Sequence, residues 1–75
     1  MASYLPFRMT HEDERQVEYT FGFPEMNRRL VIDKTSLAGT PVDGTADQDY
    51  AAVLVKILRF RRGEMRFPAS GAYAA

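Results

Sequence analysis

The chain of 75 residues contains no cysteine, no tryptophan and a single histidine, His11. Without cysteine it forms no disulfide, which fits a reducing compartment. One histidine and no cysteine are too few ligands for a transition-metal site in a monomer. No segment approaches the ~18 apolar residues of a membrane-spanning helix. Residues 1–14 are too acidic and too short in apolar run for a signal peptide, and we therefore expect a cytoplasmic protein without a membrane span.

Motifs for catalysis and cofactor binding are missing as well. The sequence has neither a GxGxxG nor a GxxxxGK[ST] glycine pattern to cradle a phosphate. His11 is a candidate general base, but the sequence positions no nucleophile beside it. Three consecutive carboxylates point in different directions, so a solvated acidic surface is favoured over a cation site at Glu12, Asp13 and Glu14. We expect no enzyme activity, no catalytic residue, no metal and no cofactor.

The most apolar stretch, residues 47–62, predicts one long amphipathic helix. Helical spacing gathers five apolar side chains on one side, with Leu54 near the centre. These side chains are Tyr50, Ala51, Leu54, Ile57 and Leu58. Val53, Val55 and Phe60 widen the apolar arc beyond the ~100° stripe of an ordinary surface helix.

Signals for the ends of this helix flank it on both sides. Thr45, followed three residues later by Gln48, resembles a capping box at the start. Gly63 is the residue type that favours the left-handed conformation just past a helix end. We therefore expect the helix to begin after Thr45 and to stop before Gly63.

Strict alternation of apolar residues predicts a strand from Val17 to Phe23, with a return strand at residues 28–33. A four-residue turn would pair Phe23 with Arg28 and would place Glu18 opposite Asp33. Aromatic residues on this strand are also a candidate stacking platform for single-stranded nucleic acid. Because they share a face with Leu30 and Ile32, a core position is favoured for Tyr19, Phe21 and Phe23.

The remaining segments complete one small domain, 1–75. Residues 1–16 are expected to form an arm and an acidic connector, in which residues 5–9 are either a third, edge strand or an arm on a partner. Residues 34–46 are expected to be a loop anchored by Leu37 and Val42. Residues 63–75 are expected to be a tail, either disordered or laid in extended form over a neighbour.

Charge is distributed unevenly along the neutral chain. The net charge is −3 over residues 1–27, −1 over residues 28–55 and +4 over residues 56–75. Attraction between the acidic first third and the basic last quarter is the favoured explanation, and an anionic partner is the alternative. The candidate residues for binding a partner or an anion are Arg28, Arg29, Lys56, Arg59, Arg61, Arg62 and Arg66.

The predicted fold is α+β, an antiparallel β-hairpin packed against one long C-terminal helix. Two strands and one helix leave the flanks of a wide apolar arc uncovered, so we expect a homodimer. For function, we expect a small, non-enzymatic and regulatory protein-interaction module with an unknown protein partner. The alternative is a nucleic-acid-binding protein that uses the basic end of the helix.

The last four residues, Ala72, Tyr73, Ala74 and Ala75, resemble the alanine-rich ends that bacterial energy-dependent proteases recognise. The resemblance to the tag added to stalled ribosome products rests on three alanines alone. It implies a bacterial protein whose end is read by such a protease.

Overall fold

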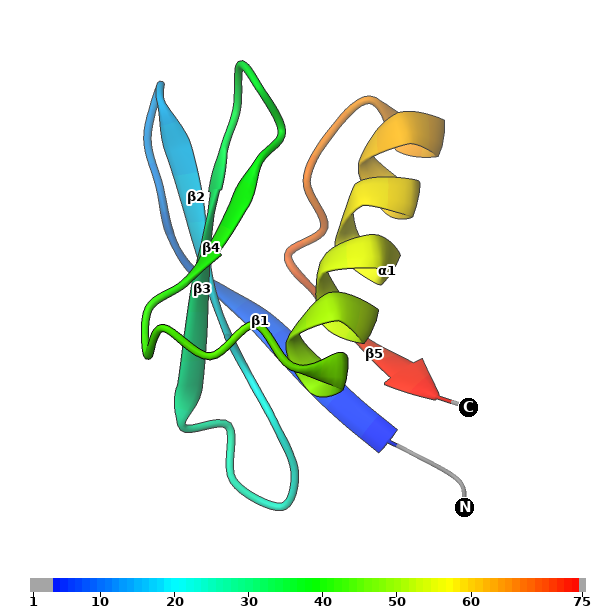
Figure 1. Ribbon diagram of the computed structural model, residues 1–75. Helices are drawn as coiled ribbons and strands as arrows, with labels where there is room; N and C mark the ends of the chain where they lie inside the picture. The colour runs from blue at the N-terminus through cyan, green and yellow to red at the C-terminus, as the bar shows by residue number, and fades with distance from the viewer. Residues whose placement is uncertain (1–3, 75) are drawn as a thin grey trace.

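The computed structural model describes residues 4–74, and these form a five-stranded antiparallel sheet packed against one helix. The strand order is β4-β3-β2-β1-β5, and Figure 1 shows α1 on one side of the sheet. The predicted α+β class is therefore confirmed, although the sheet has more strands than the predicted hairpin. The elements are β1 (Tyr4–Glu12), β2 (Gln16–Phe21), β3 (Arg28–Asp33), β4 (Gly39–Pro41), α1 (Gln48–Glu64) and β5 (Ser70–Ala74).

The hairpin of β2 and β3 exists, but its predicted register is wrong by two residues. Phe21 pairs with Arg28, and Glu18 pairs with Val31 rather than Asp33. The turn is longer than predicted because Gly22 leaves the strand with φ +127°, and a Cβ there would lie 2.8 Å from the carbonyl oxygen of Glu25. A shift of two residues keeps every side chain on its face, so the predicted core face survives.

The stacking-platform alternative does not survive. Tyr19 and Phe21 are fully buried beneath the helix, whereas Phe23 leaves the sheet and is 63% exposed. The Phe23 ring instead packs edge-on against Tyr4, with 5.4 Å between the ring centroids. No row of exposed aromatic rings therefore remains on this strand.

The segment expected to be an arm and connector holds β1, an interior strand between β2 and β5. Its expected edge position was inferred from Pro6, which cannot donate a backbone hydrogen bond. The carbonyl of Pro6 accepts from the N–H of Gly22, which lies just past the end of β2. The nitrogen of Pro6, which carries no hydrogen, faces this same point beyond the end of β2. Residues 1–3 of the predicted arm lie outside the described residues.

The predicted loop at residues 34–46 contains β4, a short strand at one edge of the sheet. The two predicted anchors are wrong, because Leu37 is 38% exposed and Val42 is 58% exposed. The real contact with α1 is at Gly39, where an added Cβ would lie 2.7 Å from the Tyr50 hydroxyl and from a methyl carbon of Leu54. Glycine therefore lets the helix approach this edge of the sheet.

Both predicted ends of α1 are wrong by one or two residues. The N-cap is Asp47, whose carboxylate accepts from the Tyr50 N–H at 3.0 Å, and Thr45 has no such role. Gly63 lies inside the helix, and Met65 takes the left-handed conformation at φ 60°. The N–H of Met65 donates to the Arg61 carbonyl at 2.9 Å, which closes the last turn.

The buried face of α1 is rotated from the predicted one. Val53 and Ile57 are fully buried, whereas Leu54 is only half-buried and Val55 is 46% exposed. The centre of the buried face of α1 therefore lies on the line through Val53 and Ile57 rather than at Leu54. The hydrophobic core consists of Leu5, Phe7, Val17, Tyr19, Phe21, Leu30, Ile32, Tyr50, Val53 and Ile57.

The predicted tail returns to its own sheet as β5, which pairs with β1. Its path is set by the buried Tyr19 hydroxyl, which donates to the Pro68 carbonyl at 2.5 Å, and by Met9, whose N–H donates to the Ala69 carbonyl. Gly71 leaves room for the ring of Phe7, which a Cβ would meet at 2.7 Å. The protease-tag resemblance now falls on an ordered strand, apart from Ala75, which lies outside the described residues.

Candidate functional site

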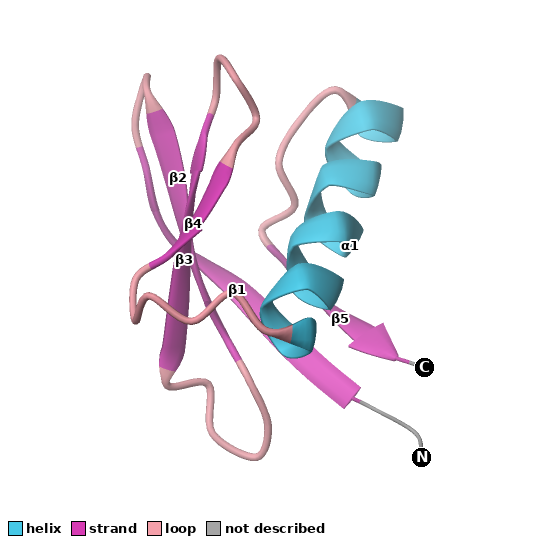
Figure 2. Ribbon diagram, in the orientation of Figure 1, coloured by secondary structure: helices cyan, strands magenta, loops and turns pink. Residues whose placement is uncertain are grey.

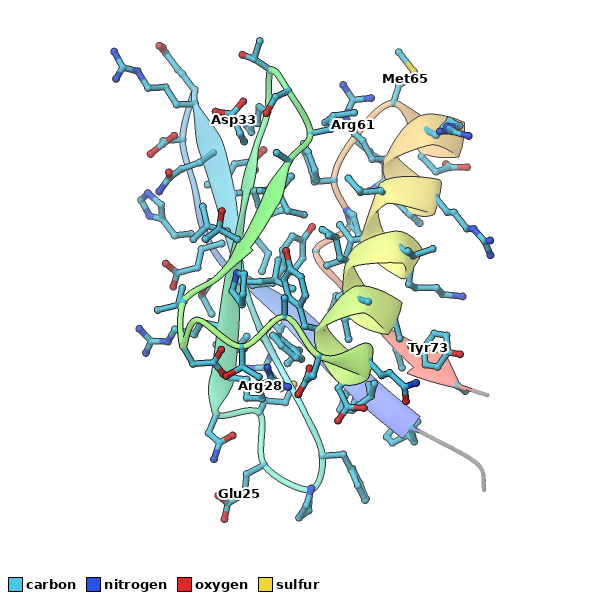
Figure 3. All side chains as sticks on the ribbon, in the orientation of Figure 1. Glu25, Arg28, Asp33, Arg61, Met65 and Tyr73 are labelled. Carbon is cyan, nitrogen blue, oxygen red and sulfur yellow. The ribbon has the colours of Figure 1, made fainter. Side chains whose placement is uncertain are left out.

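The candidate basic residues fall into separate groups in the structure, and Figure 3 shows that Arg28 and Arg61 lie far apart. Arg28 is at the start of β3, under the first turn of α1. Arg29 is on the opposite face of the sheet. The others are on or just after α1, at Lys56, Arg59, Arg61, Arg62 and Arg66.

Arg28 is occupied by an internal network. Its guanidinium donates to Asp43 at 2.9 Å, to Asp47 at 3.0 Å and to the Thr45 carbonyl at 3.0 Å. It also lies 4.8 Å from the centre of the Phe21 ring. A guanidinium with two carboxylates and a cation–π contact is satisfied in place. Arg28 therefore joins β3 to the start of α1 and is not an unpaired cation.

The two carboxylates of this network are held in their charged form. The pKa of Asp43 is lowered first by the Thr45 N–H and then by Arg28. The pKa of Asp47 is lowered first by the Tyr50 N–H and then by Arg28. Donors that hydrogen-bond a carboxylate favour its ionised state, so the network persists throughout the neutral range.

Three exposed cations, Lys56, Arg59 and Arg62, form a row along the solvent side of α1, which we call the basic face. They follow one another three residues apart, so neighbouring side chains approach one another on the helix surface. Among residues 4–74, none of the three makes an ion pair. The basic face therefore keeps its full positive charge toward solvent.

The acidic connector does not fold over this face. Glu12 pairs with Lys34 at 2.7 Å. Asp13 accepts from the N–H groups of Arg15 and Gln16 at 2.8 and 2.9 Å, and these bonds lower its pKa. The carboxylates of Glu12 and Asp13 thus make their contacts at their own end of the sheet.

Arg61 and Arg66 lie at the end of α1, beside the chain that leads to β5. The guanidinium of Arg61 is 5.5 Å from the Phe67 ring centre, and that of Arg66 is 5.2 Å from the Phe60 ring centre. Both border a cleft of about 450 Å³ whose far wall carries Glu12 and the Lys34 that pairs with it. These two arginines are therefore held by aromatic contacts, unlike the basic face.

A groove runs between α1 and β5 next to the basic face. It has a volume of about 470 Å³. Small apolar side chains form its floor, and basic side chains form its rim. The lining residues are Ala51, Ala52, Val55, Lys56, Arg59, Tyr73 and Ala74.

No protein-family model, curated protein or solved structure matches this chain. The function must therefore be argued from its own surfaces.

Sequence reasoning found the cations of the groove but missed Tyr73 and Ala74. Nothing in the sequence placed residues 70–74 next to α1, because SGAYA has no β-branched residue and only one aromatic side chain. Arg8 was not among the predicted binding residues. It faces solvent on the outer side of the sheet, and cross-strand pairs align it in one row with Thr20, Arg29 and Ser70.

Chemistry-bearing side chains are sparse over the described residues. His11 lies 3.3 Å from Asp13, and both are exposed. The neighbouring Thr10 hydroxyl donates to the Glu18 carboxylate at 3.2 Å and not to the imidazole. Within residues 4–74, no three metal-ligating side chains gather at one point, and α1 lacks the length and apolar character needed to cross a membrane.

Proposed function

We propose that the protein is a small, non-enzymatic and regulatory protein-interaction module. The observation that carries this proposal is the groove between α1 and β5, where exposed Val55 and half-buried Tyr73 adjoin Lys56 and Arg59, two cations that make no ion pair within residues 4–74. Apolar surface flanked by charges that no acid within residues 4–74 neutralises is typical of a surface that meets another protein. A cytoplasmic location is consistent with the absence of cysteine.

The proposal is tested by capture from a native lysate of the source organism. Immobilised wild-type protein is expected to retain a protein partner in the presence of nuclease. An Arg59→Glu/Arg62→Glu variant is expected to lose it, because the charge of the basic face is reversed. An Arg8→Glu/Arg29→Glu variant makes the same charge change on the outer face of the sheet and should retain the partner. Capture of nothing specific, or equal capture by both variants, contradicts the proposal.

A nucleic-acid-binding role is the second candidate, favoured by one observation. The basic face is not covered by Glu12, which pairs with Lys34 instead. If the cations Lys56, Arg59 and Arg62 contact phosphates, log K for duplex DNA should fall with log salt at a slope of about −0.9 per contact. A labelled duplex titrated at two salt concentrations measures this slope. Binding that is undetectable at low salt, or that survives Arg59→Glu/Arg62→Glu, removes this candidate.

Homodimer formation remains part of the proposal, on a narrower basis than the sequence suggested. The flank of α1 at Leu58 and Val55 is incompletely covered, and Val55 is 46% exposed. The five-stranded sheet, however, covers more of the helix than a hairpin would. Light scattering at micromolar concentration should give twice the chain mass of 8.5 kDa. A single-chain mass with a melting temperature independent of concentration contradicts the dimer.

A further inference from the structure

Within residues 4–74, no strand pairs with the outer edge of β5, and we call it the open edge. In the order β4-β3-β2-β1-β5, β5 pairs on one side with β1 and is the last strand on the other. The opposite edge, β4, is only three residues long and ends at Pro41. Short edge strands and proline are common protections against edge pairing. Residues 70–74 carry neither a proline nor a charge, so this edge lacks such protection.

The register shows which backbone groups point outward. Pro6 is opposite Ala72, and the Pro6 carbonyl points toward β2, where it accepts from Gly22. In an antiparallel ladder, alternate residues bond to opposite neighbours. The N–H and C=O groups of Gly71 and Tyr73 therefore face β1. Those of Ser70, Ala72 and Ala74 point to the open side, where an added strand would meet them.

The groove beside this edge fits the side chains of such a strand. Tyr73 and Ala74 belong to β5 itself, and the opposite wall is the solvent side of α1. In an added strand, every second side chain would face α1, at intervals of about 6.6 Å. Lys56 and Arg59 are separated by about 5–6 Å on the helix, so two alternate side chains of the added strand can reach both cations.

The charged side chains that border the groove indicate which kind of segment can bind in it. Lys56 and Arg59 have no ion-pair partner among residues 4–74, which favours carboxylates on the incoming strand. Asp49 lies at the neighbouring hollow with Leu5 and Tyr73, and this carboxylate disfavours acids at that end. A second copy joined edge to edge would bring its own Lys56 and Arg59 to the same groove and add like-charge repulsion.

We infer that the open edge of β5 and the adjoining groove bind an extended acidic segment of a partner protein by strand addition. Its helix-facing side chains are apolar near Ala51 and Tyr73 and carboxylates near Lys56 and Arg59. Main-chain hydrogen bonds to β5 supply the affinity, and the alternate side chains supply the specificity. This inference rests on the proposed interaction function and names the partner chemistry for its surface.

The test uses a synthetic peptide of eight residues with blocked ends. Its odd positions are Val, Val, Glu and Glu, its even positions are Thr, and a control peptide has Lys in place of Glu. Amide spectra of the 15N-labelled full chain are recorded during titration. We expect saturable shifts at the amides of Ser70, Ala72 and Ala74, and slower hydrogen exchange at these amides in the complex. The lysine peptide should not bind.

Two matched pairs of variants separate the backbone from the charge. Ala72→Pro removes the outward N–H without removing a bond to β1, and should weaken binding about tenfold, as expected for the loss of one or two backbone hydrogen bonds. Ala72→Val keeps the N–H and should bind like the wild type. Lys56→Glu/Arg59→Glu should abolish binding, whereas Arg8→Glu/Arg29→Glu on the outer sheet face should not. A melting curve for each variant confirms that it is folded.

Each contrary result overturns the inference in a recognisable way. Absence of peptide binding, or equal binding by Ala72→Pro and Ala72→Val, excludes strand addition. Shifts confined to other residues would place the peptide elsewhere. Protection of the three amides in free protein at doubled mass would make a second copy the occupant. In all these cases a partner captured through the basic face would still support the interaction function, so the two failures are distinguishable.

Discussion

Neighbouring residues of the same type have opposite roles in this chain. Arg28 and Arg29 are adjacent, yet Arg28 lies under α1 with Asp43 and Asp47, while Arg29 faces solvent on the other side of β3. Alternation along a strand dictates that the two differ, and the sequence had already assigned the strand. The missing information was the position of the loop carrying Asp43, which is fixed only by tertiary contacts.

Two glycines make a matched test of packing at the residue scale. A Cβ at Gly39 would lie 2.7 Å from the Tyr50 hydroxyl and a Leu54 methyl carbon, whereas a Cβ at Gly63 would have no heavy atom within 4 Å. Gly39→Ala should therefore lower the free energy of unfolding by about 1–3 kcal/mol through overpacking. Gly63→Ala should raise it by about 0.5–1 kcal/mol, because alanine is the better helix former.

Urea unfolding of the two glycine variants measures both effects. Opposite signs are the expected result. If Gly39→Ala is as stable as the wild type, α1 does not approach β4 as described. If Gly63→Ala is destabilising, Gly63 is not inside the helix, and the sequence-based end of the helix would be restored.

At the scale of elements, α1 was predictable and its rotation was not. The apolar arc was so wide that several helix phases fitted it equally well, and the sequence could not choose between Leu54 and Val53 as its centre. The structure places Val53 and Ile57 at zero exposure. The choice is made by contacts with the sheet, including the close approach at Gly39.

Truncation on the two sides of α1 tests this phase. Ile57→Ala should destabilise the protein by about 2–5 kcal/mol, since it removes fully buried methyl groups and leaves a cavity. Val55→Ala removes methyl groups from a side chain that is 46% exposed and should cost much less. Thermal or urea unfolding of the two variants distinguishes them. Equal losses would contradict this phase of α1, in which Ile57 is fully buried and Val55 is not.

The strands likewise differ in whether the sequence predicts them. β2 and β3 were predicted from alternation, because half-buried strands carry that pattern. β4 and β5 were missed because GTP and SGAYA are short and rich in small residues, and each is a strand only through its neighbour. The candidate site was therefore predicted only in part. Its cations were visible in the sequence, but its β5 wall depended on a strand that has no local signal.

At the scale of the whole molecule, acid stability follows from several carboxylates together. Hydrogen bonds from turn or cap N–H groups lower the pKa values of Asp13, Asp33, Asp43 and Asp47 below 3.8. A pKa that is lower in the folded state gives stability that is present above the unfolded pKa and is lost as the pH falls through the folded one. The melting temperature should therefore be level down to about pH 5 and fall below about pH 4.

The contribution of the Arg28 network to this fall can be isolated. An Asp43→Asn/Asp47→Asn variant should melt lower than the wild type at pH 7, and the gap should narrow as the pH falls below about 4. Asp49→Asn is the control, because Asp49 is exposed and makes no hydrogen bond among residues 4–74. A gap that is constant from pH 7 to pH 3 would show that the two carboxylates do not titrate with unfolding.

The antiparallel pairing of β1 with β5 sets Tyr4 directly opposite Ala74, and Figure 2 shows both ends leaving the molecule at one corner. A short peptide linker can therefore join residue 74 to residue 4 without disturbing either strand. The chain can then be reopened in the exposed loop between β4 and α1, at Gly44, so that the pairing of β2 with β3 stays local. In such a circular permutant β1 and β5 become consecutive strands of one hairpin. The pairing that is now the longest in sequence separation would form locally, and the permutant should fold faster than the natural order of the chain.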